Sequence, residues 1–337
     1  MSRYLALPKA LRALPVWIAV SGGLDSTVLA AVALRLRPRL PSLHFAHVNY
    51  RLRVPDSDRE EASLKDWAGR EGVPIRVLRL RPRAKPSNLQ AWARERRLAF
   101  FRSLIASRSG GSGLIWMAHH QGDQAETVLA RLLRGAGLKG LRGMDELEEI
   151  GGLWVFRPFL EVPREALELY ARSHRLGFHH DRSNDGDDYL RNRIRHRILP
   201  RMAEENPRIQ EVLAVFAARA GQTAAALETL AQDWLRRAAR GSAAGPAALD
   251  RRALKRLPPA LRASVLEAWL RGGTGREQSF GKILPPLLAG LEKTAEGIEL
   301  PLKGGFWVQL SPQKLLLRRR STPLRAAPGR RRPGVAV

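Results

Sequence analysis

One stretch decides the fold, and it reads Val16-Trp17-Ile18-Ala19-Val20-Ser21-Gly22-Gly23-Leu24-Asp25-Ser26-Thr27. Its first five residues are apolar, include β-branched side chains and follow a proline, a pattern that predicts a buried strand. Residues 26–37 are apolar along one face, which predicts a helix. The stretch therefore predicts a strand, a glycine-containing loop and a helix in direct succession.

The same alternation continues along the chain. Three further apolar runs predict strands, at residues 43–48, 73–80 and 114–118. Three periodic segments predict helices, at residues 59–71, 88–107 and 123–134. Strands that alternate with helices favour an α/β fold, a doubly wound and mostly parallel sheet covered on both faces. Ligands bind beyond the carboxyl ends of such strands, so the segments that follow them are the first candidates for a site. These segments are residues 21–26, 47–53 and 119–126.

The amino-acid composition of the chain changes near residue 206. Two Ala- and Leu-rich segments predict helices, at residues 209–240 and 249–271, and residues 298–317 contain short β-like stretches. The last residues hold many arginines and little to bury, which predicts disorder. We therefore expect an α/β domain (1–205), a smaller, mainly helical C-terminal domain with some strand (206–317) and a basic tail (318–337).

The charge balance is strongly positive. The chain of 337 residues carries 58 Lys and Arg against 32 Asp and Glu, a formal net charge of +26. Such a surface attracts polyanions, of which nucleic acid is the commonest in a cell. The alternative is a bias in composition that has filled solvated faces with arginine.

The chain has no cysteine, which excludes disulfides, thiolate metal sites and iron–sulfur clusters held by its own side chains. It contains no apolar run of the length that a transmembrane helix needs, and its start lacks the pattern of a signal peptide. We therefore expect a cytoplasmic protein with no membrane partner.

The loop between the first strand and helix has the composition of a phosphate-binding loop. Glycines at positions 22 and 23 let a phosphate approach the backbone, and the start of a helix attracts anions. Asp25 would repel bare phosphate, so its presence suggests a Mg²⁺ ion between carboxylate and phosphate. We predict that ATP contacts the whole loop, Ser21, Gly22, Gly23, Leu24, Asp25 and Ser26. The alternative is an incidental turn between strand and helix.

The loop resembles that of N-type ATP pyrophosphatases, whose fold is that of the adenine nucleotide alpha hydrolases. More motifs follow in order: Phe45-Ala46-His47-Val48-Asn49-Tyr50-Arg51-Leu52-Arg53, Ala93-Arg94-Glu95-Arg96-Arg97-Leu98-Ala99-Phe100-Phe101, Ala118-His119-His120-Gln121-Gly122-Asp123-Gln124-Ala125-Glu126-Thr127 with its continuation Leu132-Leu133-Arg134-Gly135-Ala136-Gly137-Leu138, Arg157-Pro158-Phe159-Leu160, Asp181-Arg182-Ser183-Asn184 and Arg191-Asn192-Arg193-Ile194-Arg195. Together they resemble the tRNA(Ile)-lysidine synthetases over residues 16–202. The chain departs from that family at Tyr50, where it usually has His, and at Gly122, where it usually has Asp.

The resemblance implies a ligase reaction in two steps. Cytidine O2 attacks the α-phosphate of ATP, and the ε-amine of free L-lysine then attacks C2 and expels AMP. The RNA would be tRNA(Ile) with the anticodon CAU, modified at the wobble cytidine (position 34), and the C-terminal domain would bind it.

Several residues are candidates for these steps. Arg94 and Arg97 lie three apart on one helix, so either can neutralise charge at phosphorus beside Asp25. Asp123 and Glu126 have the same spacing, and the resemblance also points to them as the acids that bind lysine. The predicted catalytic set is therefore Asp25, Arg94, Arg97 and Asp123. The residues expected to face RNA are Arg191, Asn192, Arg193 and Arg195.

Each of these assignments has an alternative. The two acids would also suit a helix start, and the arginines would also suit a solvated face. His119 and His120 with Asp123 would make an incomplete metal site. Other enzymes with this loop thiolate RNA or make amides, and a non-catalytic RNA-binding protein is a further possibility. The sequence does not fix the oligomeric state, and a homodimer stays open.

Overall fold

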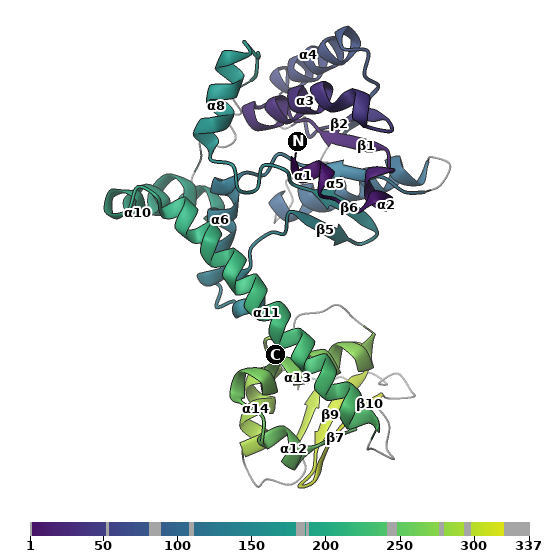
Figure 1. The fold of residues 1–337 in the computed structure, drawn as a ribbon, viewed down its shortest axis with the longest axis vertical. Coiled ribbons are helices and arrows are strands. Elements are labelled where there is room, and N and C mark those ends of the chain that lie inside the picture. The colour runs from purple at the N-terminus through teal and green to yellow at the C-terminus, as the bar shows by residue number, and fades with distance from the viewer. Residues whose placement is uncertain are drawn as a thin grey trace, which may run out of the picture. The chain divides into compact units, whose positions relative to one another are not determined.

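The computed structural model describes residues 2–51, 54–80, 89–107, 111–179, 186, 189–240, 248–275, 280–292 and 298–319. The chain divides into two compact units, residues 1–221 and 222–337, and the division falls within one long helix, α11 (Ile209–Arg240) (Figure 1). We expected the boundary at residue 206, where the composition changes. The first turns of α11 belong instead with the preceding residues, because Ile209 and Leu213 pack on a cluster around Leu129.

Six strands form one sheet in the described part of the first unit, in the order β3-β2-β1-β4-β6-β5. They are β1 (Val16–Ala19), β2 (Leu43–Asn49), β3 (Ile75–Arg79), β4 (Leu114–Trp116), β5 (Leu147–Ile150) and β6 (Leu153–Phe156). Neighbouring strands are parallel except for β5 and β6, which pair antiparallel. The α/β fold with a mostly parallel sheet is thereby confirmed.

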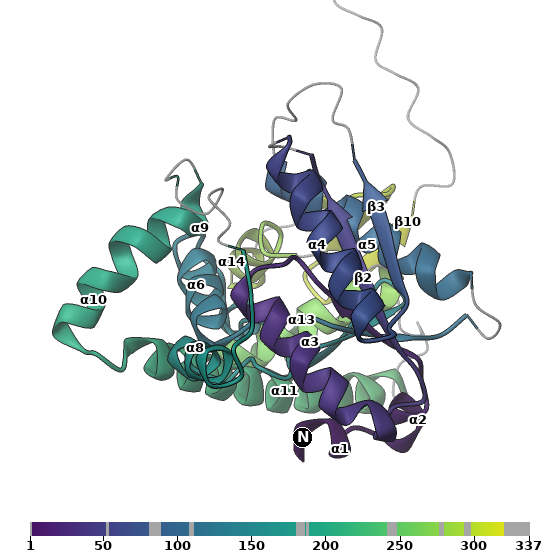
Figure 2. The same ribbon diagram turned by 90° about the horizontal axis from the view of Figure 1, so that it is seen from above.

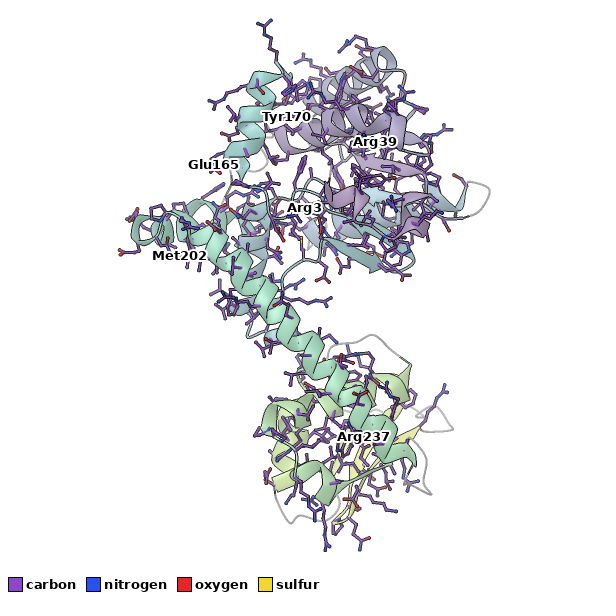
Figure 3. The ribbon with its side chains drawn as sticks, in the orientation of Figure 1. Arg3, Arg39, Glu165, Tyr170, Met202 and Arg237 are labelled. Carbon is purple, nitrogen blue, oxygen red and sulfur yellow. The ribbon has the colours of Figure 1, made fainter. Side chains whose placement is uncertain are left out.

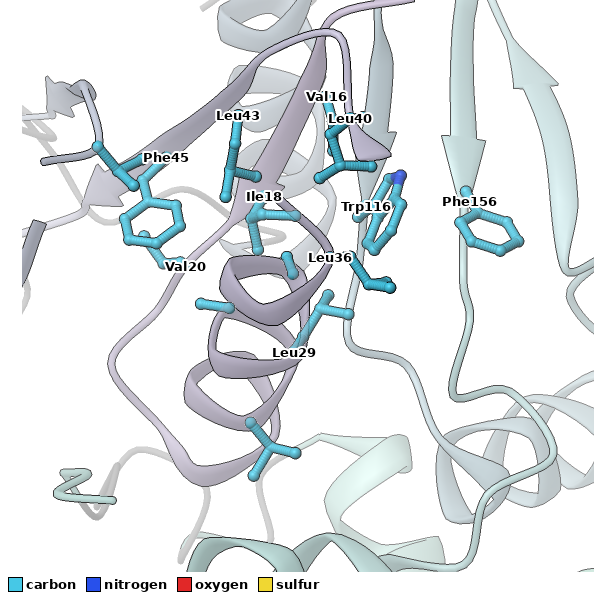
Figure 4. Close-up of a cluster of buried hydrophobic side chains, with 14 of the residues drawn as sticks. Val16, Ile18, Val20, Leu29, Leu36, Leu40, Leu43, Phe45, Trp116 and Phe156 are labelled. Carbon is cyan, nitrogen blue, oxygen red and sulfur yellow. The ribbon is translucent and has the colours of Figure 1, made fainter. Parts of the chain in front are cut away.

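Helices cover both faces of this sheet. Helices α3 (Leu24–Leu36) and α4 (Asp56–Arg70) lie on one face (Figures 1 and 2). Ile18 of β1 packs there with Leu29 of α3 (Figure 4), and buried residues of α4 belong to the same cluster. Trp17, the next residue, packs on the opposite face with Phe101 of α5 (Leu89–Ala106). Successive strand side chains point to opposite faces, so a continuous apolar run is what a sheet buried on both sides requires.

The described part of the first unit contains further helices and helical turns. They are α1 (Ser2–Leu5), α2 (Lys9–Arg12), a 3-10 turn (Arg37–Arg39), α6 (Gln121–Leu132), α7 (Leu138–Leu141), α8 (Arg164–Ser173), α9 (Leu190–Arg193), a π-helical turn (Ile194–Ile198) and α10 (Leu199–Glu205). Arg3 of α1, labelled in Figure 3, forms ion pairs with Glu146 and Glu161 and so fixes α1 to the loops flanking β5 and β6. No helix in the described ranges is both long enough and apolar enough to cross a membrane.

The π-helical turn brings two apolar side chains of its segment to the same face. Ile194 and Leu199 are both buried in the cluster with Leu129, although they are five residues apart. In a regular α-helix, residues five apart point about 140° away from each other. The wider π-turn brings both side chains to the same face, and such turns are frequent at functional sites.

The second unit combines helices with an antiparallel sheet. In its described residues the strands have the order β7-β10-β9-β8 and are β7 (Ala248–Asp250), β8 (Ile298–Pro301), β9 (Phe306–Leu310) and β10 (Lys314–Arg319). They pack on α12 (Arg251–Lys255), α13 (Pro259–Thr274), α14 (Leu284–Glu292) and the end of α11.

Two expectations for the second unit need correction. The continuous helix expected at residues 249–271 is a strand followed by two helices, because Pro258 and Pro259 start a new helix after α12. Strand β10 includes residues 318 and 319, which we had assigned to the tail. The rest of the tail, residues 320–337, lies outside the described residues.

A buried acid supports the carboxyl end of β2. Glu61 of α4 is 1% exposed and accepts hydrogen bonds from Arg79 (2.7 and 2.8 Å) and Asn49 (3.0 Å). The bonds from Arg79, followed by those from Lys65 and Asn49, outweigh burial and lower the pKa of Glu61 to about 2.

We therefore expect acid to destabilise the first unit through Glu61. Its folded pKa lies below its unfolded pKa, so this contribution is complete above pH ~4.5 and is lost as the pH falls toward ~2. Denaturant unfolding at pH 6 and pH 3 measures the loss. Glu61→Gln should show a smaller fall in unfolding free energy over that interval. A fall equal to that of the unchanged protein would refute the role of Glu61.

Candidate active site

The loop after β1 is held in a defined shape by its own serines. The Ser26 hydroxyl accepts a hydrogen bond from the Ser21 N–H (3.0 Å) and donates one to the Gly23 carbonyl (3.1 Å). Gly22 has a φ of +88°, a left-handed conformation that favours glycine. The loop therefore turns sharply between β1 and α3, and the positive end of the α3 dipole faces the space beyond the sheet.

A cavity of about 380 Å³ lies at this loop. It is lined by the loop and by residues at or just beyond the carboxyl ends of β1, β2 and β4, among them Ala19, Val48, Tyr50, Ala118 and His119. Its size falls in the range of small-molecule sites, about 300–1,000 Å³. Five of the six loop residues expected to contact ATP line it; Gly22 is buried at the back of the turn.

Three buried polar atoms at the cavity have no hydrogen-bond partner in the described part of the chain. They are Asp25 Oδ1, Arg97 Nε and His119 Nδ1. Burial raises the pKa of Asp25 and lowers the pKa of Arg97. An unsatisfied buried polar group costs about 1–3 kcal/mol, so a ligand that pairs with these atoms would gain that energy. The arrangement suits an anionic ligand at Arg97 and a cation at Asp25.

Of the two candidate arginines on α5, only Arg97 reaches the cavity. Its neighbours there are Tyr50, which packs on Trp92, and Phe101. Arg94, one turn earlier, is exposed and is not among the cavity residues that the structure describes.

The two acids on α6 are buried and paired. Asp123 and Glu126 have side chains 13% and 3% exposed. Arg191 contacts both, through Nη2 to Asp123 (2.7 Å) and Nε to Glu126 (2.6 Å). Arg195 also contacts both, through Nε and Nη2 to Glu126 (2.5 and 3.1 Å) and Nη2 to Asp123 (3.4 Å). Burial opposes ionisation of Asp123, but Arg191, His120 and His119 outweigh it and lower its pKa to about 2.

The residues expected to face RNA therefore do not form one exposed surface. Arg191 and Arg195 turn toward the acids, and Asn192 is buried and donates a hydrogen bond to the Gly186 carbonyl. Arg193 is exposed. The motif at residues 181–184 lies outside the described residues.

His120 joins the nucleotide loop to the acids. Its Nδ1 accepts a hydrogen bond from the Gly122 N–H (3.0 Å), which leaves the proton of the neutral ring on Nε2. Nε2 lies 3.8 Å from Asp25 Oδ2 and 3.6 Å from Asp123 Oδ2. Among the described residues, no group of three or more His, Asp or Glu side chains is arranged to hold a metal ion.

Gly122 makes room for this histidine. A Cβ atom at position 122 would lie 2.8 Å from His120 Cε1 and 3.1 Å from Gln210 Oε1. A larger residue at this position would push the imidazole from its place in this structure.

We expect Gly122→Ala to lower the free energy of unfolding by about 1–2 kcal/mol, because the ring must move and its N-cap bond is lost. The matched control is Gly69→Ala in α4, where a Cβ meets nothing within 4 Å. That change should stabilise by about 0.5–1 kcal/mol, the helix-propensity gain of alanine. Urea unfolding measures the free energy of unfolding of both variants. If both substitutions stabilise the protein, position 122 is not crowded.

Four residues that line the cavity were not predicted from the sequence: Arg164, Phe178, His179 and His196. Arg164 is the first residue of α8, and the His179 N–H donates to the Gly22 carbonyl (2.9 Å). Both come from segments far along the chain from the loop, and no local pattern marks them.

Comparison with known proteins gives concordant results. A family model described as a PP-loop domain matches residues 2–202. The chain is 40% identical to the tRNA(Ile)-lysidine synthase of Methylobacterium sp. (strain 4-46), over 86% of this chain and 87% of that protein. It is 36% identical to the tRNA(Ile)-lysidine synthase of Methylobacterium nodulans, over 88% and 90%. The solved structure of the U34-tRNA thiolase NcsA from Methanococcus maripaludis is similar in fold, with a TM-score of 0.53 and 16% identity over 65% of this chain and 77% of that one.

Proposed function

Because the chain belongs to the tRNA(Ile)-lysidine synthase family, we propose that it uses ATP to join free L-lysine to C2 of the wobble cytidine of tRNA(Ile) with a CAU anticodon. The observation that supports this most is the position of the cavity. It holds unsatisfied groups for a phosphate at the loop, and His120 and Arg195 connect it to two buried acids that already bind cationic side chains.

In the first step cytidine O2 attacks the α-phosphorus, a new P–O bond forms and pyrophosphate leaves. Negative charge develops at phosphorus, where preorganised donors stabilise the transition state most. Arg97 and the loop serve this role, because Arg97 Nε is buried and aimed at no other partner in the described residues.

Asp25 would hold Mg²⁺ in this step. Its Oδ1 is a hard oxygen ligand without a hydrogen-bond partner among the described residues, and burial disfavours its charge until a cation arrives. Mg²⁺ commonly binds to one or two carboxylates together with phosphate oxygens and water. When bound, the ion neutralises phosphate charge.

In the second step the lysine ε-ammonium gives up a proton to solvent and the free amine attacks C2. A C–N bond forms, and AMP leaves with the former O2. Asp123 and Glu126 bind the lysine ammonium in our proposal, and Asp123 is ionised at neutral pH because of its lowered pKa. The exposed Arg193 and the residues 206–317 remain our candidates for RNA contacts, and a homodimer remains a prediction for light scattering to test.

The decisive experiment incubates the protein with ATP, Mg²⁺, labelled lysine and an unmodified tRNA(Ile) transcript with a CAU anticodon. We expect label in the RNA, with one pyrophosphate and one AMP released per lysine. Changing the first anticodon base should abolish incorporation. AMP formation with a different RNA or acceptor, and none with lysine, would refute the proposed substrate.

A further inference from the structure

Both acids proposed to bind lysine are already paired with protein groups in this structure. Asp123 Oδ1 accepts from Arg191 and Arg195, while Oδ2 accepts from the His120 backbone N–H (3.0 Å). Both oxygens of Glu126 accept from the same two arginines. No oxygen of either acid is left without a partner.

Lysine cannot simply be added to this cluster. Two carboxylates and two guanidinium groups balance in charge, so a lysine ammonium would leave an unbalanced positive charge among buried groups. An unpaired buried charge is strongly unfavourable. The ammonium must therefore take the place of at least one guanidinium group.

The positions of the two arginines allow them to move away from the acids. Their side chains are 38% and 28% exposed, whereas those of the acids are 13% and 3% exposed. Arg195 also lines the cavity, and so does its neighbour His196. A phosphate offers a guanidinium group the same bidentate pairing as a carboxylate does. RNA phosphates at the mouth of the cavity would therefore compete directly with Asp123 and Glu126 for these side chains.

We propose that Arg191 and Arg195 form a latch on the lysine site: they occupy Asp123 and Glu126 until RNA phosphates draw them away, so that RNA binding opens the site to lysine. The proposal rests on the proposed function, because it assumes that these acids bind lysine. Coupling of this kind is reciprocal, so lysine tightens RNA binding by the same factor.

The first test uses the unchanged, full-length protein. Equilibrium dialysis measures labelled lysine binding without ATP, with and without an RNA hairpin of the CAU anticodon stem and loop. We expect the hairpin to tighten lysine binding about tenfold or more. Equal dissociation constants with and without the hairpin would overturn the latch.

Variants separate the latch from other effects of RNA. Arg191→Gln removes one competing cation, so lysine should bind about tenfold more tightly without RNA, and the effect of the hairpin should shrink. Arg195→Gln is the second variant and covers the case that Arg191→Gln does not fold. In Arg195→Gln, Arg191 still contacts both acids. The control is Arg201→Gln, which removes the same charge from an exposed pair with Glu204 and should behave like the unchanged protein. Unchanged or weaker RNA-free lysine binding in both latch variants refutes the proposal.

Asp123→Asn separates a failure of the proposed lysine site from a failure of the latch alone. If the acids bind lysine, this variant loses lysine binding with and without the hairpin. Retained binding would refute the proposed lysine site itself. Lost binding in Asp123→Asn, together with unaltered binding in both arginine variants, would refute the latch alone.

Discussion

Asp25→Ala should lower the rate of pyrophosphate release by about 10²–10³-fold or more while leaving the protein at least as stable as before. The two effects have one cause. Asp25 Oδ1 is buried and has no hydrogen-bond partner in the described residues, and burial raises the pKa of its carboxyl. A group of this kind destabilises the free protein and becomes favourable only when a cation and the phosphates of ATP arrive.

Single-turnover pyrophosphate release and urea unfolding measure both effects. The control is Asp66→Ala, which removes an exposed acid from α4 and should change neither quantity. A loss of activity accompanied by a large loss of stability would mean that Asp25 holds the loop together and does not serve ATP. Unchanged activity would remove it from the site.

Arg251→Ala should destabilise the second unit by about 3–5 kcal/mol. Arg251 is 3% exposed, and its guanidinium group donates to the carbonyls of Gly290 (2.8 Å), Leu291 (3.0 Å) and Ser311 (3.0 Å). These carbonyls lie in the last turn of α14 and just after β9. Alanine would leave all three carbonyl oxygens without this donor and open a cavity where the buried side chain now lies.

Hydrogen exchange of the β9 and β10 amides, with denaturant unfolding, measures the loss in this unit. The adjacent Arg252 is exposed, so Arg252→Ala should change the free energy of unfolding by no more than about 0.5 kcal/mol. Equal effects of the two substitutions would show that Arg251 acts only as a surface charge.

The parts of the fold that the sequence predicted are those with local causes. Strands β1 and β4 are continuous apolar runs because both faces of the sheet are buried at its centre, and the loop after β1 is marked by its own glycines and serines. Strands β5 and β6 were missed. β5 is a four-residue edge strand with two glutamates, so it lacks the apolar pattern of a buried strand.

The site was predicted only in part for a similar reason. Periodicity placed Arg94 and Arg97 on one face of a helix, but the buried residues of α5 begin at Phe101, so only the nearer arginine reaches the cavity. The pairing of Arg191 with Asp123 joins residues 68 positions apart. No spacing rule along the chain reports such a contact, because it depends on how α9 packs against α6.

The π-helical turn at Ile194–Ile198 makes the latch segment sensitive to the insertion of a residue. One inserted residue would rotate everything beyond it by about 100° relative to the residues before it. Removal of one residue would instead give a regular α-helix in which the positions of Ile194 and Leu199 are four apart and still share a face. After an insertion, Leu199 would leave the apolar cluster, or Arg191 and Arg195 would swing away from the acids. Substitutions that keep the apolar and basic pattern, and removal of one residue between Arg195 and Leu199, should be tolerated in this segment, whereas insertion of a single residue should not.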